Sequence, residues 1–226
     1  MNDWNVVLQE TLQLLVEKCP RLVAFCYWGG TAAIALEELH HRESFDLDFH
    51  TRQALLDVRP ILAEMQSVFG DDFEMLHAPD DFGSGFLGVL TLPSGNRINV
   101  EVLSNYQDVE EDELVPSSSA KGLSRVSLSR YLADKIQCVL ERCEARDLVD
   151  IRAVLLAHPE MQDEAKRLVA NQDCLLLAER LLSWSDADLE EDLRSYRDAN
   201  AKDAMEARDL LTSWLKPDSR SEDTTP

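Results

Sequence analysis

The stretch that decides the fold is Tyr27–Thr51, which reads YWGGTAAIALEELHHRESFDLDFHT. The apolar segment Leu22–Trp28 is rich in residues that favour strands, and Gly29-Gly30 ends it. Residues Thr31–His41 are rich in alanine and leucine, which predicts a short helix directly after the glycine turn. The stretch therefore opens as a strand, a turn and a helix.

The segment Ser44–His50 alternates strictly between polar and apolar residues, which predicts a strand. Residues two apart on a strand point to the same face. One predicted face carries Ser44, Asp46, Asp48 and His50. The opposite face carries Phe45, Leu47 and Phe49. The pattern places two carboxylates side by side on a strand with an apolar back.

Asp46 and Asp48 repel each other in this arrangement, and a hard cation is the usual way to stabilise such a pair. Mg²⁺ prefers oxygen ligands and is commonly held by one or two carboxylates together with substrate phosphates. The Gly29-Gly30 turn lets the backbone approach a ligand closely, and free N–H groups at a helix start attract phosphate. Together these features predict a site for a nucleoside triphosphate and Mg²⁺.

Each feature alone has a simpler interpretation. A lone Gly-Gly is usually a turn, and a lone Asp-x-Asp on an amphipathic strand is usually a solvated face. The order of strand, Gly-Gly-Thr, helix and Asp-x-Asp strand is far more specific than either part.

These residues resemble a known family. Gly29-Gly30-Thr31-Ala32, followed by Arg42-x-Ser44-x-Asp46-x-Asp48-Phe49, resembles the AbiEii/AbiGii-type toxin nucleotidyltransferases of the DNA polymerase β-like superfamily. The resemblance implies that Asp46 and Asp48 are catalytic and bind two Mg²⁺ ions, with a nucleoside triphosphate as substrate. It also implies that the nucleotide is bound by Gly29, Gly30, Thr31 and Ser44. Ser44 and Arg42 match the family pattern, and the two either orient phosphate or only end the preceding helix.

Glu101 is a candidate third metal ligand. It is an acidic residue within the otherwise apolar strand predicted over residues 97–103, about where the superfamily places its third carboxylate. The alternative is a surface glutamate on a half-exposed strand, and the sequence leaves the two interpretations even.

A second group of candidate residues lies on predicted helices. If the helix beginning near residue 128 continues, then Lys135, Arg142 and Arg146 share one face and form an anion site. Lys135 with Arg146-Asp147-x-x-Asp150 resembles the lysine and the Arg-Asp-x-x-Asp motif of the AbiEii-type family. The resemblance implies that Lys135 contacts the triphosphate and that Asp147 and Asp150 complete the catalytic site. The alternative is a solvated helix stitched by ion pairs.

The remaining chain predicts an α+β protein with a mixed sheet and flanking helices, followed by an all-helical part. Further strands are predicted near 73–77, 86–92 and 97–103, an acidic loop at 108–113 and a linker at 116–119. Asn2 or Asp3 caps a first helix, and a second amphipathic region spans 53–69, with Pro60 as the expected start of regular helix. Helices are predicted near 128–143, 146–157, 159–170, 173–184, 186–196 and 199–215. The predicted domains are 1–115, nucleotidyltransferase; 116–216, helical; and 217–226, a disordered tail.

Composition limits the function further. The 226 residues carry a formal net charge of −21, which disfavours a general nucleic-acid binder, although a local basic patch can still bind tRNA. No segment resembles a membrane span or a signal peptide, and five scattered cysteines indicate reduced thiols, so we expect a cytoplasmic protein without a membrane partner.

The expected reaction moves a nucleoside monophosphate from Mg²⁺-NTP to a hydroxyl group. The resemblance points to RNA, with a tRNA 3′ end or acceptor stem as the leading acceptor, and to the toxin of a toxin–antitoxin or abortive-infection system with a cognate antitoxin as a partner. The alternatives are transfer to a small molecule or protein side chain, and a non-catalytic relative that acts as a binding module.

Overall fold

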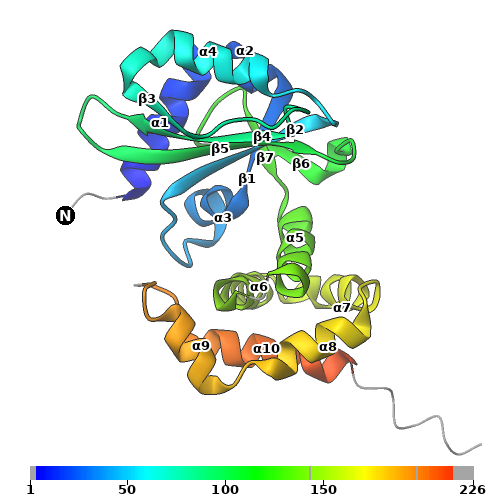
Figure 1. Ribbon diagram of the computed structural model, residues 1–226. Coiled ribbons are helices and arrows are strands. Elements are labelled where there is room, and N and C mark those ends of the chain that lie inside the picture. Colours follow the sequence, from blue (N-terminus) through cyan, green and yellow to red (C-terminus); the bar gives the residue numbers. More distant parts are fainter. Residues whose placement is uncertain (1–3, 143, 197, 216–226) are drawn as a thin grey trace, which may run out of the picture. The chain divides into compact units, whose positions relative to one another are not determined.

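The computed structural model describes residues 4–142, 144–196 and 198–215 (Figure 1). The chain divides between Tyr131 and Leu132 into two compact units, called here the first and the second unit. The predicted cap at Asn2 or Asp3 and the predicted disordered tail at 217–226 lie outside the described residues.

The first unit is built on a seven-stranded mixed sheet with the order β3-β4-β5-β2-β1-β7-β6. The strands are β1 Cys26–Gly29, β2 Asp46–Ala54, β3 Phe73–His77, β4 Gly85–Thr91, β5 Arg97–Asn105, β6 Leu114–Pro116 and β7 Ser124–Val126. Strand β2 runs antiparallel to β1 and parallel to β5, and β7 runs parallel to β1. The predicted α+β class with a mixed sheet is confirmed.

The helices of the first unit lie on both faces of the sheet (Figure 1). Helices α1 (Trp4–Lys18), α2 (Pro20–Phe25) and α4 (Arg59–Phe69) cover one face (Figure 1). Leu47 and Phe49 of β2 are fully buried, as the alternation predicts. Helix α3 (Gly30–Ile34), continued by a π-helical turn at Ala35–Leu39, lies on the opposite face, to which Asp46 and Asp48 point.

Two local predictions change, and one is confirmed. The strand expected from Leu22 begins only at Cys26, because Pro20 starts helix α2, where its missing N–H is not needed. Phe45 precedes β2, so it is 47% exposed and packs edge-on against Trp4, with ring centroids 5.1 Å apart. The predicted start of regular helix at Pro60 is confirmed to within one residue, because α4 begins at Arg59 with Pro60 in its first turn, while the first residues of this region belong to β2.

The segment expected to be a linker lies between two strands. Strands β6 and β7 pair with each other on either side of 117–123, and β7 pairs with β1, so this region extends the sheet. The units consequently meet at 131/132, after β7, whereas the sequence placed the boundary at 115/116. Strands of three residues are too short for an alternating pattern to reveal them.

The second unit is helical throughout its regular structure, as predicted. Its helices are α5 Leu128–Glu141 (which begins in the first unit), α6 Ala145–Ala157, α7 Gln162–Ala170, α8 Cys174–Ser183, α9 Asp186–Leu193 and α10 Ala201–Leu215. Helix α10 packs against α6, α7, α8 and α9, and buries Ala204, Ala207 and Leu211 (Figure 1). Small side chains on α10 allow its neighbours to approach closely.

Within the described residues, no helix is long and apolar enough to cross a membrane. The four cysteines of the described chain, Cys19, Cys26, Cys138 and Cys174, are free thiols. Burial raises the pKa of both Cys19 and Cys26 to about 12, so neither is a reactive thiolate at neutral pH.

Candidate active site

Strand β2 presents the predicted carboxylate pair on its less buried face. Asp46 and Asp48 are both partly exposed, whereas Leu47 between them is buried. Ser44 is buried, and its Oγ donates a hydrogen bond of 2.7 Å to Oδ1 of Asp46. Ser44 therefore orients Asp46, while its predicted contact with a nucleotide stays a prediction.

The glycine turn lies directly against the second carboxylate. Gly29 pairs with Asp48 in the β1–β2 register. Gly30 has φ +67°, and a Cβ at this position would lie 2.0 Å from Oδ2 of Asp48. The Asp48 carboxylate therefore occupies the space that any other side chain at position 30 would need. The predicted phosphate turn and the predicted metal carboxylates come together in the first unit.

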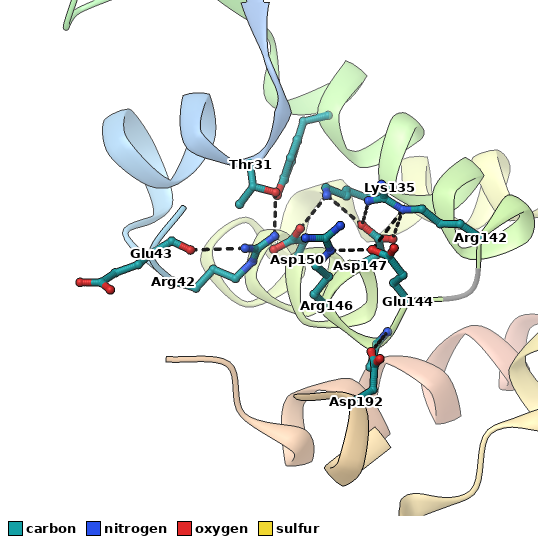
Figure 2. Close-up of polar contacts among 12 residues, drawn as sticks. Thr31, Arg42, Glu43, Lys135, Arg142, Glu144, Arg146, Asp147, Asp150 and Asp192 are labelled. Carbon is teal, nitrogen blue, oxygen red and sulfur yellow. Dashed lines mark hydrogen bonds and ion pairs between the residues drawn. The ribbon is translucent and has the colours of Figure 1, made fainter. Parts of the chain in front are cut away.

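The hydroxyl of Thr31 is held from two sides (Figure 2). Arg42 Nη2 donates to Thr31 Oγ1 at 2.8 Å, and the Tyr131 hydroxyl donates to the same oxygen at 3.3 Å. Arg42 also donates to the carbonyl of Glu43 at 3.4 Å. These bonds fix Thr31 beside the turn. The contact of Tyr131 was not predicted, because a buried aromatic residue on a helix carries no signal beyond core packing.

Glu101 lies next to Asp48 on the neighbouring strand. The parallel β2–β5 register pairs Asp48 with Glu101, so both side chains point to one face of the sheet. Burial, and then the charge of Asp46, raise the pKa of Glu101 above its ordinary value. The carboxylates of Asp46 and Glu101 are therefore close enough to repel each other. The role of Glu101 as a metal ligand stays a prediction.

The carboxylate oxygens of Asp46, Asp48 and Glu101 are the type of ligand that Mg²⁺ prefers. Among the residues described, no group of three or more His, Cys, Asp or Glu side chains is arranged to hold a metal ion. Mg²⁺ commonly takes one or two protein carboxylates and completes its octahedron with water and substrate phosphates. Asp46 and Asp48, with Glu101 in register, offer such oxygens beside a turn that a phosphate could approach.

His50 supports the turn from the same strand face. Its ring stacks on Tyr27 at a centroid distance of 5.7 Å, and a Cβ on Gly29 would lie 2.9 Å from His50 Cδ2. Burial lowers the pKa of His50 to about 4, so the ring is neutral at physiological pH. The alternating pattern places His50 on the polar face of the strand, and the structure packs its ring there against Tyr27 and Gly29.

The second unit contains a buried charge cluster around Lys135 (Figure 2). Lys135 Nζ lies 2.8 Å from Oδ1 of Asp147 and 2.8 Å from Oδ2 of Asp150, and both aspartates are fully buried. Helix α6 supplies both aspartates from positions three apart, which face the same side. This close grouping of Lys135 with Asp147 and Asp150 excludes a solvated lysine.

The single helical face predicted for Lys135, Arg142 and Arg146 is wrong, because α5 ends at Glu141 and α6 begins at Ala145. Arg142 instead donates to both oxygens of Asp147, from Nε at 2.9 Å and from Nη2 at 2.8 Å. Hydrogen bonding to Asp147 raises the pKa of Arg142 above its usual value.

Arg146 makes a different set of contacts. Its Nε donates to Glu144 at 2.6 Å, and its guanidinium lies 5.7 Å from the centre of the Tyr196 ring. Each of the three predicted cations therefore faces at least one carboxylate. Nucleotide binding by Arg142 and Arg146 stays a prediction.

A mixed sheet with a glycine turn against an Asp-x-Asp strand is the arrangement that the resemblance to the nucleotidyltransferases implies. A family model described as nucleotidyl transferase AbiEii toxin, Type IV TA system, matches residues 28–219, and the chain belongs to this family. The resemblance predicted from the sequence is thus confirmed.

Solved structures agree on the fold. JHP933 from Helicobacter pylori is 17% identical with a TM-score of 0.57, over 95% of this chain and 94% of that one. MenT4, a nucleotidyltransferase toxin from Mycobacterium tuberculosis H37Rv, is 16% identical with a TM-score of 0.53, over 96% of this chain and 84% of that one. No curated protein matches the chain significantly.

The contact between Gly30 and Asp48 predicts the effect of adding a methyl group. Gly30→Ala introduces both a left-handed alanine, which costs about 1–2 kcal/mol, and a clash with the Asp48 carboxylate. Gly95 is the matched control, because its φ is +84° and nothing lies within 4 Å of a Cβ there. We expect Gly30→Ala to lose more stability in urea unfolding than Gly95→Ala. Equal losses would show that the Asp48 carboxylate moves aside freely.

The raised pKa of Glu101 predicts a stability gain on neutralisation. Because its pKa is raised in the folded state, folding favours the protonated form, and stability falls as pH rises above the unfolded value of 4.5. In the absence of divalent ions, Glu101→Gln should therefore stabilise the protein at pH 7. The gain in stability should shrink as the pH is lowered from the raised folded pKa toward 4.5. Thermal unfolding in EDTA at several pH values measures this, and a destabilised variant at pH 7 contradicts it.

The burial of Lys135 changes the expected effect of removing it. If Lys135 only contacted the triphosphate, as the resemblance implies, Lys135→Ala would lower turnover with little loss of stability. In the structure, the substitution leaves Asp147 and Asp150 buried without their lysine, a situation that typically costs about 3–5 kcal/mol.

Urea unfolding tests this, with the exposed Lys121→Ala as control. Adding Asp150→Asn to Lys135→Ala should recover part of the loss, because one of the two buried carboxylates that lost the lysine is then neutral. Equal stability of Lys135→Ala and the wild type would show that the two aspartates become neutral at little cost.

Proposed function

We propose that this protein transfers a nucleoside monophosphate from Mg²⁺-bound nucleoside triphosphate to a hydroxyl group. The observation that carries the proposal is the contact of the Asp48 carboxylate with Gly30, in the strand register that also pairs Asp48 with Glu101. Membership of a family of toxin nucleotidyltransferases supports the reaction class.

The chain's own residues have distinct tasks in this proposal. Asp46 and Asp48 would hold Mg²⁺, with Glu101 as a further oxygen donor. The bound ions would supply the positive charge that helps deprotonate the acceptor and neutralises the departing pyrophosphate. Ser44 holds Asp46 in orientation, and Gly30 lets the phosphates approach the backbone. Lys135 is proposed as a further contact of the triphosphate.

For the acceptor we propose RNA, with a tRNA 3′ end as the first candidate, and for the biological role the toxin of a toxin–antitoxin pair. The family description names a toxin of a Type IV system, which supports a cognate antitoxin. The substrate itself is inferred from the family resemblance alone.

One observation favours a second candidate, a small molecule or a protein side chain. Several cations of the first unit are already engaged by its own carboxylates. These pairs are Arg59–Asp57, Arg97–Glu74, Arg125–Glu37 and Arg130–Glu113. With a net charge of −21, an RNA acceptor would require cations that are not committed in this way.

Labelled transfer separates these possibilities. The protein is incubated with each α-labelled nucleoside triphosphate, Mg²⁺ and either total cellular RNA or RNase-treated extract. We expect label in RNA, loss of transfer in EDTA, and a loss of about a hundredfold or more in Asp48→Asn. The exposed Asp71→Asn is the matched control for charge and should be unchanged.

The salt dependence identifies the acceptor. Transfer to RNA should weaken steeply between low and physiological salt, because phosphate contacts release counterions. Label in protein or small molecules with little salt dependence would favour the second candidate. No Mg²⁺-dependent transfer from any nucleotide to either preparation would contradict the proposed reaction.

A further inference from the structure

Three large side chains are strongly exposed where strands of the first unit end. Leu55 follows β2 and is 73% exposed, Phe82 lies in the β3–β4 loop and is 85% exposed, and Tyr106 follows β5 and is 86% exposed. Exposure of one such residue is ordinary, but three at one end of a sheet indicate an interaction surface.

Backbone hydrogen bonds hold the three segments together. Leu55 N–H donates to the Asn105 carbonyl at 2.7 Å, which places Leu55 beside Tyr106. Val58 N–H donates to the Gly83 carbonyl at 3.0 Å, and Ser104 N–H donates to Ser84 at 2.7 Å, so the loop carrying Phe82 joins both strand ends. We call these three residues and their segments the apolar patch.

The backbone conformation of Leu55 lowers the stability of the fold. Its φ is +52°, in the left-handed region, which costs an ordinary residue about 1–2 kcal/mol. A leucine there gains little burial in return, because most of its side chain is exposed. Asn or Gly would adopt the same conformation more easily, so packing within this protein does not explain leucine at this position.

The rim of the patch is acidic. Asp57 contacts Gly83, Asp108 accepts a hydrogen bond of 2.8 Å from the Ala54 N–H, and Asp81 directly precedes Phe82. Arg59 is paired with Asp57 at 2.7 Å. An anionic rim around apolar side chains repels nucleic acid, anionic lipid and a second copy of a chain with net charge −21.

We propose that the apolar patch is a docking site for a basic segment of another protein that bears large apolar side chains. Leu55, Phe82 and Tyr106 would supply the apolar contacts, and Asp81 and Asp108 of the rim would attract the partner's lysine or arginine. The patch follows the last residue of β2, while Asp46 begins that strand, so the two lie roughly 25 Å apart along it. This site is independent of the proposed transfer reaction.

The test uses the full chain and a defined probe. The probe is a fluorescent amphipathic helix made of lysine and leucine, with a glutamate–leucine peptide of the same pattern as its control. We expect the wild type to bind the lysine–leucine peptide, with affinity that falls as salt rises, and not to bind the acidic peptide.

A matched pair of variants locates the site. Leu55→Asn/Tyr106→Ser removes side chains that are 73% and 86% exposed, and Leu182→Asn/Leu175→Ser removes side chains on α8 that are 71% and 86% exposed. The patch variant should bind the peptide at least about tenfold more weakly. The α8 variant should bind as the wild type does.

Stability and assembly give independent readouts. Leu55→Asn alone should raise the midpoint of urea unfolding, because it relieves the left-handed leucine. Equal weakening by both double variants, equal binding of the acidic peptide, or no binding of either peptide would overturn the proposal. Dimers in sedimentation that are abolished by Leu55→Asn/Tyr106→Ser would also overturn it and assign the patch to a second copy.

Discussion

The register of β2 between β1 and β5 is the constraint on which the first unit depends. It places Asp48 opposite Gly29 on one side and opposite Glu101 on the other. A slip by one residue would turn Asp46 and Asp48 into the core and bring Leu47 and Phe49 to the surface. Burial of Leu47 and Phe49 therefore fixes the position of the carboxylates.

The two units differ in how their carboxylates are paired. In the second unit, Asp147 and Asp150 are fully buried, and Lys135 lies within 2.8 Å of both. In the first unit, the sheet leaves Asp46, Asp48 and Glu101 on one face, and the pKa of Glu101 is raised by burial and by Asp46. Carboxylates paired with a lysine support the fold. Carboxylates that repel one another on one sheet face favour the binding of a cation.

Much of this arrangement was predictable from sequence because it depends on local patterns. Strict alternation identified β2 and the face of its aspartates, and the Gly-Gly-Thr order identified the turn. Contacts between distant segments were not predictable in the same way. Tyr131 reaches Thr31 from a helix far along the chain, and Arg142 turns toward Asp147 because α5 ends one residue earlier. The short strands β6 and β7 were missed because three residues carry no periodicity.

If the first unit binds nucleotide and metal as proposed, charge would link the two binding steps. A triphosphate approaching Gly30 meets Asp48, whose carboxylate lies against that glycine. Like charges at this distance repel strongly where water is partly excluded, so anion binding without a cation is unfavourable. A divalent ion held by the carboxylates would reverse the sign of the local field. Metal and nucleotide should then increase each other's affinity by the same factor, because coupling between two ligands is reciprocal. In the proposed reaction, the contact between Gly30 and Asp48 would thus make the turn selective for nucleotide that arrives with its metal.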